Sequence, residues 1–214
     1  MPVLGMSQDT GKIVRWLKAE GEIHLYQSLL QDSSFFELLL RLDEEAAGEA
    51  RRGGCGCGGA LHGASYERKP RGGPAGLAPG SAVRFSFCCA REGCRRRMTP
   101  SSLRFLGRKV FFGVLVLLLP VLRDGPTPER LARLRAAYGV SVRTVRRWCR
   151  FWREAFVTGR AWQAVRGRFA APVRAESMPG ALLGALCEIS DVANRVVAVL
   201  RLVSPIDAGA ARAS

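Results

Sequence analysis

The chain has 214 residues, 48% of them hydrophobic, so it is long enough and apolar enough to fold around a core. Its 33 Lys and Arg residues outnumber its 18 Asp and Glu residues, and its formal net charge is +15. That charge argues against an enzyme for a small neutral metabolite. It favours a polyanionic partner, with nucleic acid ahead of an anionic membrane surface.

The N-terminal residues carry charged side chains such as Asp9 and Lys12 and contain no apolar stretch of signal-peptide length. We therefore expect a cytoplasmic, nucleoid-associated protein whose seven cysteines are reduced. The longest apolar run, residues 110–122, is interrupted by Gly113 and Pro120. It is shorter than the roughly 20 residues that a membrane span needs, so we expect a buried helix and no membrane partner.

Residues 1–52 are expected to form an N-terminal helical region, because their apolar residues recur at helical spacing. Ser34 and Glu37 have the spacing of a capping box, which predicts that Ser34 caps a helix ending near Ala50. The acidic run at residues 43–45 is interpreted as a solvated face.

Residues 53–104 are expected to form a zinc-ribbon β-hairpin, because they hold five of the seven cysteines. Two closely spaced thiol pairs about thirty residues apart are typical of a ribbon, in which four thiolates bind one tetrahedral Zn²⁺. In a reducing compartment this pattern favours a metal over disulfides. The predicted zinc ligands are Cys55, Cys57, Cys89 and Cys94.

The hairpin itself is predicted from the residues between the two pairs. Val83, Phe85 and Phe87 alternate with polar residues, as in a strand, and residues 60–68 are the expected partner strand. Residues 69–80 are rich in glycine and proline and would form a long basic tip, either solvated or inserted in a minor groove.

Several alternatives remain open for the metal site. Cys89 shares the parity of the apolar face, so it is preferred to Cys88, which is the alternative ligand. His62 can replace a thiolate, because the Cys-x-Cys spacing is narrower than the usual knuckle and the second pair is wider. A cluster of buried thiols without metal is the other interpretation.

A basic stretch follows the last of these cysteines. Arg95, Arg96 and Arg97 come directly after Cys94, and we expect them to contact phosphates. Three further residues extend this expected surface along the chain: Arg104, Arg108 and Lys109.

Residues 105–174 are expected to form a helix-turn-helix domain. Thr127 starts a helix, Gly139 supplies the turn and Ser141 caps the second helix. Arg135 departs from the pattern, because the residue where the two helices cross is usually small; an ordinary amphipathic helical hairpin is the alternative. The residues expected to contact DNA on the open face are Ser141, Arg143, Thr144, Arg146, Arg147 and Arg150.

Residues 175–214 are expected to form a C-terminal helix and tail, with apolar residues from Leu182 to Leu200 closing the core or pairing with a partner. The predicted fold class is therefore mainly α, with an inserted zinc-ribbon β-hairpin and a helix-turn-helix domain. The few acidic residues between 95 and 175 and the two histidines offer no catalytic carboxylate triad or nucleophile arrangement.

The cysteine-rich region also resembles a known family. The carrying segments read Cys-x-Cys-Gly-Gly-Ala-Leu-His from Cys55, Tyr-Glu-Arg-Lys-Pro-Arg-Gly-Gly-Pro from Tyr66, Phe-Ser-Phe-Cys-Cys from Phe85 and Gly-Cys-Arg-Arg-Arg-Met-Thr-Pro from Gly93. They are similar to the zinc-ribbon region of small transposase-like bacterial proteins found beside insertion sequences, and the likeness extends over residues 26–152. The resemblance implies site-specific DNA binding in a mobile element and implies no catalysis.

We therefore expect a zinc-containing protein that binds double-stranded DNA, either transposase-like or a transposition accessory without its own nuclease core. Its protein partner would be a second copy of the chain or another component of transposition. A helix-turn-helix transcription regulator and an RNA-binding zinc-ribbon protein remain the alternatives.

Overall fold

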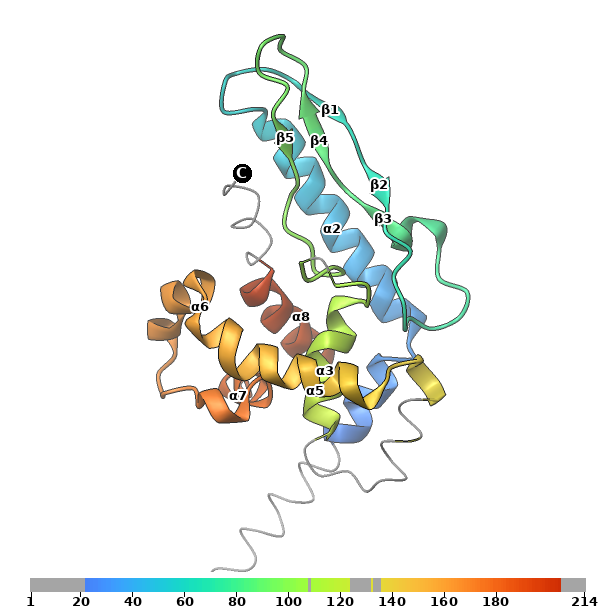
Figure 1. Cartoon of the computed structure of the whole chain (residues 1–214), viewed down its shortest axis with the longest axis vertical. Helices are drawn as coiled ribbons and strands as arrows, with labels where there is room; N and C mark the ends of the chain where they lie inside the picture. Colours follow the sequence, from blue (N-terminus) through green and yellow to red (C-terminus); the bar gives the residue numbers. More distant parts are fainter. Residues whose placement is uncertain (1–21, 108, 124–131, 133–135, 205–214) are drawn as a thin grey trace, which may run out of the picture.

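A computed structural model describes residues 22–107, 109–123, 132 and 136–204. The described chain is mainly helical, and its few strands are short (Figure 1). The helices after a first helical segment at 22–29 are α2 (Ser33–Gly53), α3 (Gly113–Arg123), α5 (Val142–Arg150), α6 (Arg160–Val165), α7 (Gly180–Ala185) and α8 (Val192–Val203). The short 3₁₀ or π segments are η1 (Pro79–Ala82), η2 (Phe151–Phe156), η3 (Arg166–Arg168) and η4 (Ala175–Ser177). The strands are β1 (Leu61–Gly63), β2 (Tyr66–Glu67), β3 (Val83–Arg84), β4 (Phe87–Cys89) and β5 (Arg97–Met98).

Helix α2 begins two residues earlier than the capping box predicts. Asp32 lies at the N-cap with an extended backbone, and its carboxylate accepts the backbone N–H of Ser34 at 2.9 Å. Asp32 supplies the capping acceptor, so Ser34 is already inside the helix and the predicted cap was wrong by two residues. The helix ends at Gly53, and the C-cap residue Gly54 has a φ of 68°, a left-handed conformation that favours glycine.

Helix α3 is the centre of the large core. Residues 114–119 are at most 2% exposed, which agrees with the expectation of a buried helix in this apolar run. The ring of Phe36 meets that of Phe112 at 5.0 Å between centroids, and Trp152 donates from Nε1 to the carbonyl of Val116 at 2.8 Å. No helix among the described residues is long and apolar enough to cross a membrane.

The remaining helices surround α3, and the large core joins residues from all four regions distinguished in the sequence, with Leu103 from the second. Where one final helix was expected, the chain forms α7 and α8. The break lies before Asp191, whose carboxylate caps α8 by accepting the N–H of Asn194 at 2.7 Å. Ending one helix and capping another lets both apolar stripes reach the core.

The strands form two small antiparallel sheets beside α2 (Figure 1). One has the order β1-β4-β5 and the other pairs β2 with β3. The expected hairpin is thus present in two parts, and β5 adds a third strand that the sequence did not predict. The inner face of the larger sheet packs on Ala47 of α2 through Leu61, Phe87 and Cys89.

The glycine-rich loop at residues 69–80 is attached to the helical body. Arg71 donates its N–H to the carbonyl of Val110 at 2.8 Å and accepts the N–H of Phe112 at 3.3 Å. A Cβ on Gly73 would lie 2.7 Å from the ring of Phe112, so only glycine allows this approach. The loop is therefore neither the freely solvated tip nor the free arm that the sequence suggested.

Asp43 and Arg104 form a buried ion pair, which corrects two expectations. Asp43 is 2% exposed and Arg104 is fully buried, and Arg104 Nε donates to Asp43 Oδ2 at 2.8 Å. The backbone N–H of Leu103 donates to the other carboxylate oxygen at 2.7 Å. Asp43 is therefore not part of a solvated acidic face, and Arg104 cannot belong to a phosphate-binding surface.

Candidate metal centre and nucleic-acid surface

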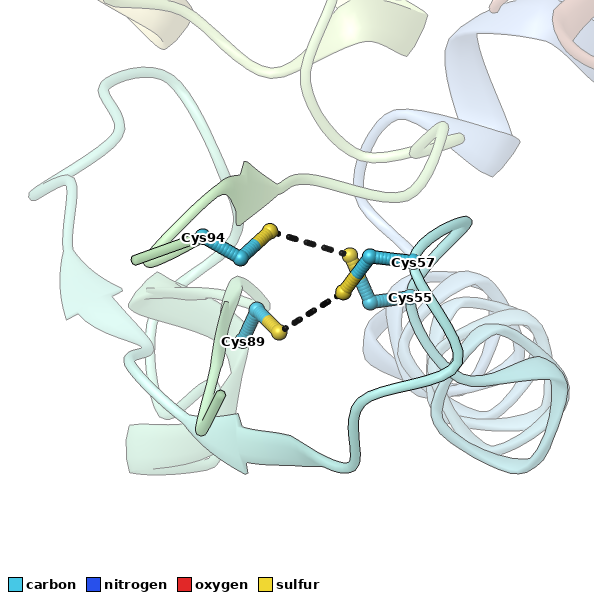
Figure 2. Close-up of side chains that lie close together, drawn as sticks. All are labelled: Cys55, Cys57, Cys89 and Cys94. Carbon is cyan, nitrogen blue, oxygen red and sulfur yellow. Dashed lines mark hydrogen bonds between the residues drawn. The ribbon is translucent and has the colours of Figure 1, made fainter. Parts of the chain in front are cut away.

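The cysteine cluster brings four thiols together. The Sγ atoms of Cys55, Cys57, Cys89 and Cys94 all lie within 4.8 Å of one another. Figure 2 shows two of these contacts, Cys55 to Cys94 at 3.8 Å and Cys57 to Cys89 at 3.5 Å. Four thiols that converge from two segments more than thirty residues apart can hold a metal ion.

A tight turn after α2 carries the first thiol pair. The N–H of Gly58 donates to the carbonyl of Cys55 at 2.7 Å, and the N–H of Cys55 donates to the carbonyl of Gly59 at 3.0 Å. A Cβ on Gly59 would lie only 2.6 Å from Sγ of Cys89. The narrow Cys-x-Cys spacing is accommodated because glycine lets this turn close around the sulfurs.

The second pair comes from the end of β4 and the turn that follows it. Cys89 is the last residue of β4 and is buried on the face toward α2. Cys94 follows a turn in which Gly93 has a φ of 82°. Arg91, in the same turn, donates from its guanidinium to the carbonyl of Cys57 at 2.8 Å, which ties the two cysteine-bearing turns together.

The thiols differ in acidity. Hydrogen bonds from the backbone N–H of Gly59 and from neighbouring thiols lower the pKa of Cys57 to about 6. The backbone N–H of Arg91 lowers the pKa of Cys89, but burial and the adjacent thiols outweigh it and raise that pKa to about 12. Without a cation, the cluster favours one thiolate, at Cys57, and opposes the ionisation of further thiols. A bound cation would stabilise the additional thiolates and so remove this electrostatic opposition.

Neither alternative ligand belongs to the cluster. Cys88 lies beside Cys89 on the opposite face of the strand, and its Sγ contacts the carbonyl of Arg95 at 3.3 Å. His62 is exposed and pairs with Cys88 in the register of β1 and β4. Strand alternation, which favoured Cys89 in the sequence, is also what separates these side chains in space.

Helix α5 presents the predicted DNA-contacting arginines on one exposed face. Arg143, Arg146, Arg147 and Arg150 are all exposed, whereas Val145, Trp148 and Cys149 on the other face are buried. At about 100° per residue the four arginines occupy an arc of roughly 100° centred opposite the buried residues. The helix therefore has its apolar side in the core and a compact cationic side toward solvent.

The start of α5 is defined by Ser141 at its N-cap. The hydroxyl of Ser141 accepts the N–H of Thr144 at 3.2 Å, and its Oγ lies 3.0 Å from that of Thr144. Before it, Gly139 has a φ of 59° and Val140 is 2% exposed. Most of the predicted first helix of the helix-turn-helix, including Thr127 and Arg135, lies outside the described residues, and its described residues, 132 and 136–138, are helical.

The arginines after the cysteine cluster do not share one environment. Arg95 and Arg96 are exposed in the turn before β5. Arg97 is exposed on β5, donates to the carbonyl of Ala64 at 3.1 Å and places its guanidinium 5.6 Å from the ring centroid of Tyr66. These residues lie by the three-stranded sheet, whereas α5 crosses the helical body (Figure 1).

Three residues that matter to these sites were not singled out from the sequence. Gly59 and Arg91 shape the cysteine cluster, and Tyr66 is an exposed aromatic ring beside Arg97. The glycine run around the thiols was a signal for Gly59. Nothing local distinguishes Arg91 or Tyr66 from other surface residues, because their roles depend on partners about thirty residues away.

Comparison of the chain with protein families, with curated proteins and with solved structures finds no match.

Proposed function

We propose that this protein binds double-stranded DNA through the exposed face of α5 and that its cysteine cluster holds one structural Zn²⁺ ion. The observation that carries the proposal is the helix α5 itself. Four exposed arginines cover one side while the other side is anchored by buried Val145 and Trp148. A chain with a net charge of +15 that presents such a helix is suited to a polyanion.

The spacing of the sulfurs supports a single ion. Thiolates bonded to one tetrahedral Zn²⁺ at about 2.3 Å lie about 3.8 Å from one another. The distances of 3.8 Å and 3.5 Å in the cluster match this spacing. In an iron–sulfur cluster the four thiolates are divided among two or four irons, so thiolates on different irons stand further apart. The all-thiolate set therefore favours zinc at one position.

The role proposed for this zinc is structural. Cys55, Cys57, Cys89 and Cys94 would fill all four positions of a tetrahedral ion, which leaves no open position for substrate or water. The ion would hold the turn after α2 against β4 and the turn that follows. The three-stranded sheet has only a minor core, around Leu61, Phe87 and Ala47, so a metal link adds stability where apolar burial is limited.

The proposed reading of DNA uses α5 as the second helix of a helix-turn-helix. Gly139 with its positive φ, the buried Val140 and the Ser141 cap are the features of the turn and helix start that support it. Arginine side chains on the first turns of such a helix pair bidentately with guanine, and those further along contact phosphates. The context of a mobile element rests on the sequence resemblance described above.

The test is selection from a random pool of duplexes by the purified, zinc-loaded full chain. We expect enrichment of a defined duplex sequence, with zinc bound at one ion per chain. A pool that stays random, or a preference for structured RNA over duplex DNA at equal salt, would contradict the proposal. The positions of the enriched sites, at element ends or at promoters, distinguish transposition from transcription control.

A further inference from the structure

The outer face of the three-stranded sheet is an open surface that the duplex-binding proposal does not use. Leu61, Phe87 and Cys89 point inward to α2, so the alternate residues point outward. His62, Cys88 and Arg97 occupy one row across β1, β4 and β5 on that outer side. His62 and Arg97 are exposed, and Cys88 is half-buried between them.

Tyr66, on β2 of the neighbouring two-stranded sheet, places an exposed aromatic ring beside Arg97 of this row. It is 43% exposed, and the guanidinium of Arg97 lies 5.6 Å from its ring centroid. Arg97 is itself held by a hydrogen bond of 3.1 Å from Nη2 to the carbonyl of Ala64. The ring is therefore kept at the surface beside a positioned cation and is not folded into the core.

The charge around this ring is mainly positive. Arg95 and Arg96 are exposed in the turn that leads into β5, and His62 lies in the same row as Arg97. The exposed acidic residues nearest in sequence are Glu67, next to Tyr66, and Glu92, three residues before Arg95. An aromatic face flanked by arginines suits a flat, electron-rich group that carries a phosphate.

We propose that this face, with Tyr66 as its stacking residue and Arg97 beside it, binds an unpaired nucleotide of DNA. A base stacks on an exposed tyrosine ring without sequence preference, and arginines next to the ring take the backbone phosphates. The inference rests on the proposed DNA-binding function and adds a substrate class to it: duplex DNA with a single-stranded extension. The face lies at the sheet, away from α5, so the two surfaces can be tested separately (Figure 1).

The experiment uses the zinc-loaded full chain and two probes, a blunt duplex and the same duplex with a single-stranded extension of about ten thymidines. We expect the extension to tighten binding to the unaltered protein. Tyr66→Leu should lose roughly five- to hundredfold in affinity for the extended probe and nothing for the blunt one. Tyr66→Phe, which keeps the ring, is the matched control and should bind both probes like the unaltered protein.

A second readout locates the contact directly. An extended probe with 5-iodouracil in its single strand should crosslink on irradiation to the peptide that contains Tyr66. An extension that adds no affinity, a Tyr66→Leu protein that binds the extended probe normally, or a crosslink confined to α5 would overturn the inference. Zinc content and thermal unfolding of Tyr66→Leu show whether that protein is folded.

The outcomes also separate this inference from the duplex proposal. If Arg143→Ala and Arg147→Ala leave blunt-duplex binding intact while Tyr66→Leu still loses the extended probe, the assignment of α5 fails and the stacking face stands. If the α5 variants lose the blunt duplex while Tyr66→Leu behaves normally, the opposite holds. Tighter binding of an oligouridine RNA than of oligothymidine would overturn the assignment of the face to DNA.

Discussion

Single residues decide how the cysteine cluster closes. Gly59 lies so near the sulfurs that a Cβ would be 2.6 Å from Sγ of Cys89 and 3.4 Å from Sγ of Cys57. Gly56, in the same turn, has nothing within 4 Å of its own added Cβ. Two glycines three residues apart thus have different constraints, because only one faces the thiols.

Gly59→Ala should therefore weaken metal binding, and Gly56→Ala should not. The added methyl group pushes Cys89 away from the position it shares with Cys57, so we expect at least a tenfold loss of zinc affinity, about 1.4 kcal/mol. Competition with a chromophoric chelator measures it. Equal affinities of the two variants would show that the turn relaxes around the methyl group.

Asp43 is a second single residue on which the stability of the fold depends. Its carboxylate meets Arg104 Nε at 2.8 Å, and Arg104 also donates to the carbonyls of Ser81 and Val83, each at 2.9 Å. Asp43→Ala would leave this guanidinium buried without its counter-charge, which costs about 3–5 kcal/mol of the free energy of unfolding. Urea denaturation measures the loss.

Glu44→Ala is the matched control, because Glu44 is the exposed neighbour of Asp43 on α2. Its effect should lie within about 0.5 kcal/mol of zero. A similar loss of stability in both variants would mean that helix propensity, and not the buried pair, controls the outcome.

At the scale of elements, the arginines of α5 and those of the turn before β5 differ in how firmly the backbone positions them. The arginines of α5 project from a capped helix with a buried opposite face, so their positions are well defined. Arg95 and Arg96 lie in an exposed turn. A rigid helix suits the reading of bases, whereas a turn suits contacts with phosphates of any sequence.

Substitutions in the two elements should therefore differ in kind. Arg143→Ala or Arg147→Ala should cost about 1–3 kcal/mol on the selected duplex and relax its sequence preference. Arg95→Ala or Arg96→Ala should weaken binding to all duplexes alike. Each should also reduce the slope of log affinity against log salt concentration by roughly one unit per lost phosphate contact. Salt titrations on selected and scrambled duplexes provide the measurement.

Arg41→Ala removes an exposed arginine from α2 and controls for net charge. Arg41→Ala should change the affinity for duplex DNA far less than the substitutions in α5 or in the turn before β5. If Arg143→Ala and Arg147→Ala weaken selected and scrambled duplexes equally, α5 is a phosphate-binding surface without a reading role.

At the scale of the whole molecule, the part of the chain that the structure describes contains two cores of unequal size. The large one joins α2, α3, α5 and α8, and the small one lies between the end of α2 and the sheet, next to the thiols. The cysteine cluster contributes two members, Cys55 and Cys89, to the small core. A metal ion bound there would stabilise the sheet much more than the helical body.

Removal of the metal should accordingly loosen one part of the molecule. After chelation we expect faster hydrogen exchange in residues 54–98 and little change in α3 and α8, with the helical circular dichroism signal largely kept. Cys55→Ser should reproduce the pattern, and Cys88→Ser, outside the cluster, should not. Unfolding of the helical body on chelation would show that the two cores depend on each other.

Local patterns in the sequence were enough to predict the features that repeat every few residues. The spacing and parity of the cysteines identified the four thiols that converge, and the period of α5 placed its arginines opposite Val145 and Trp148. The mainly helical fold followed in the same way. These features depend on which face of a helix or strand is apolar, and neighbouring residues determine that.

The tertiary structure alone decided which polar residues are exposed. Asp43 looked like its neighbour Glu44, and Arg104 looked like Arg96, until a contact across 61 residues placed the pair in the interior. The docked loop at 69–80 and the placing of Tyr66 beside Arg97 depend on contacts of the same kind. Burial of a charge is favourable only when a distant partner satisfies it, and no local pattern records where that partner lies.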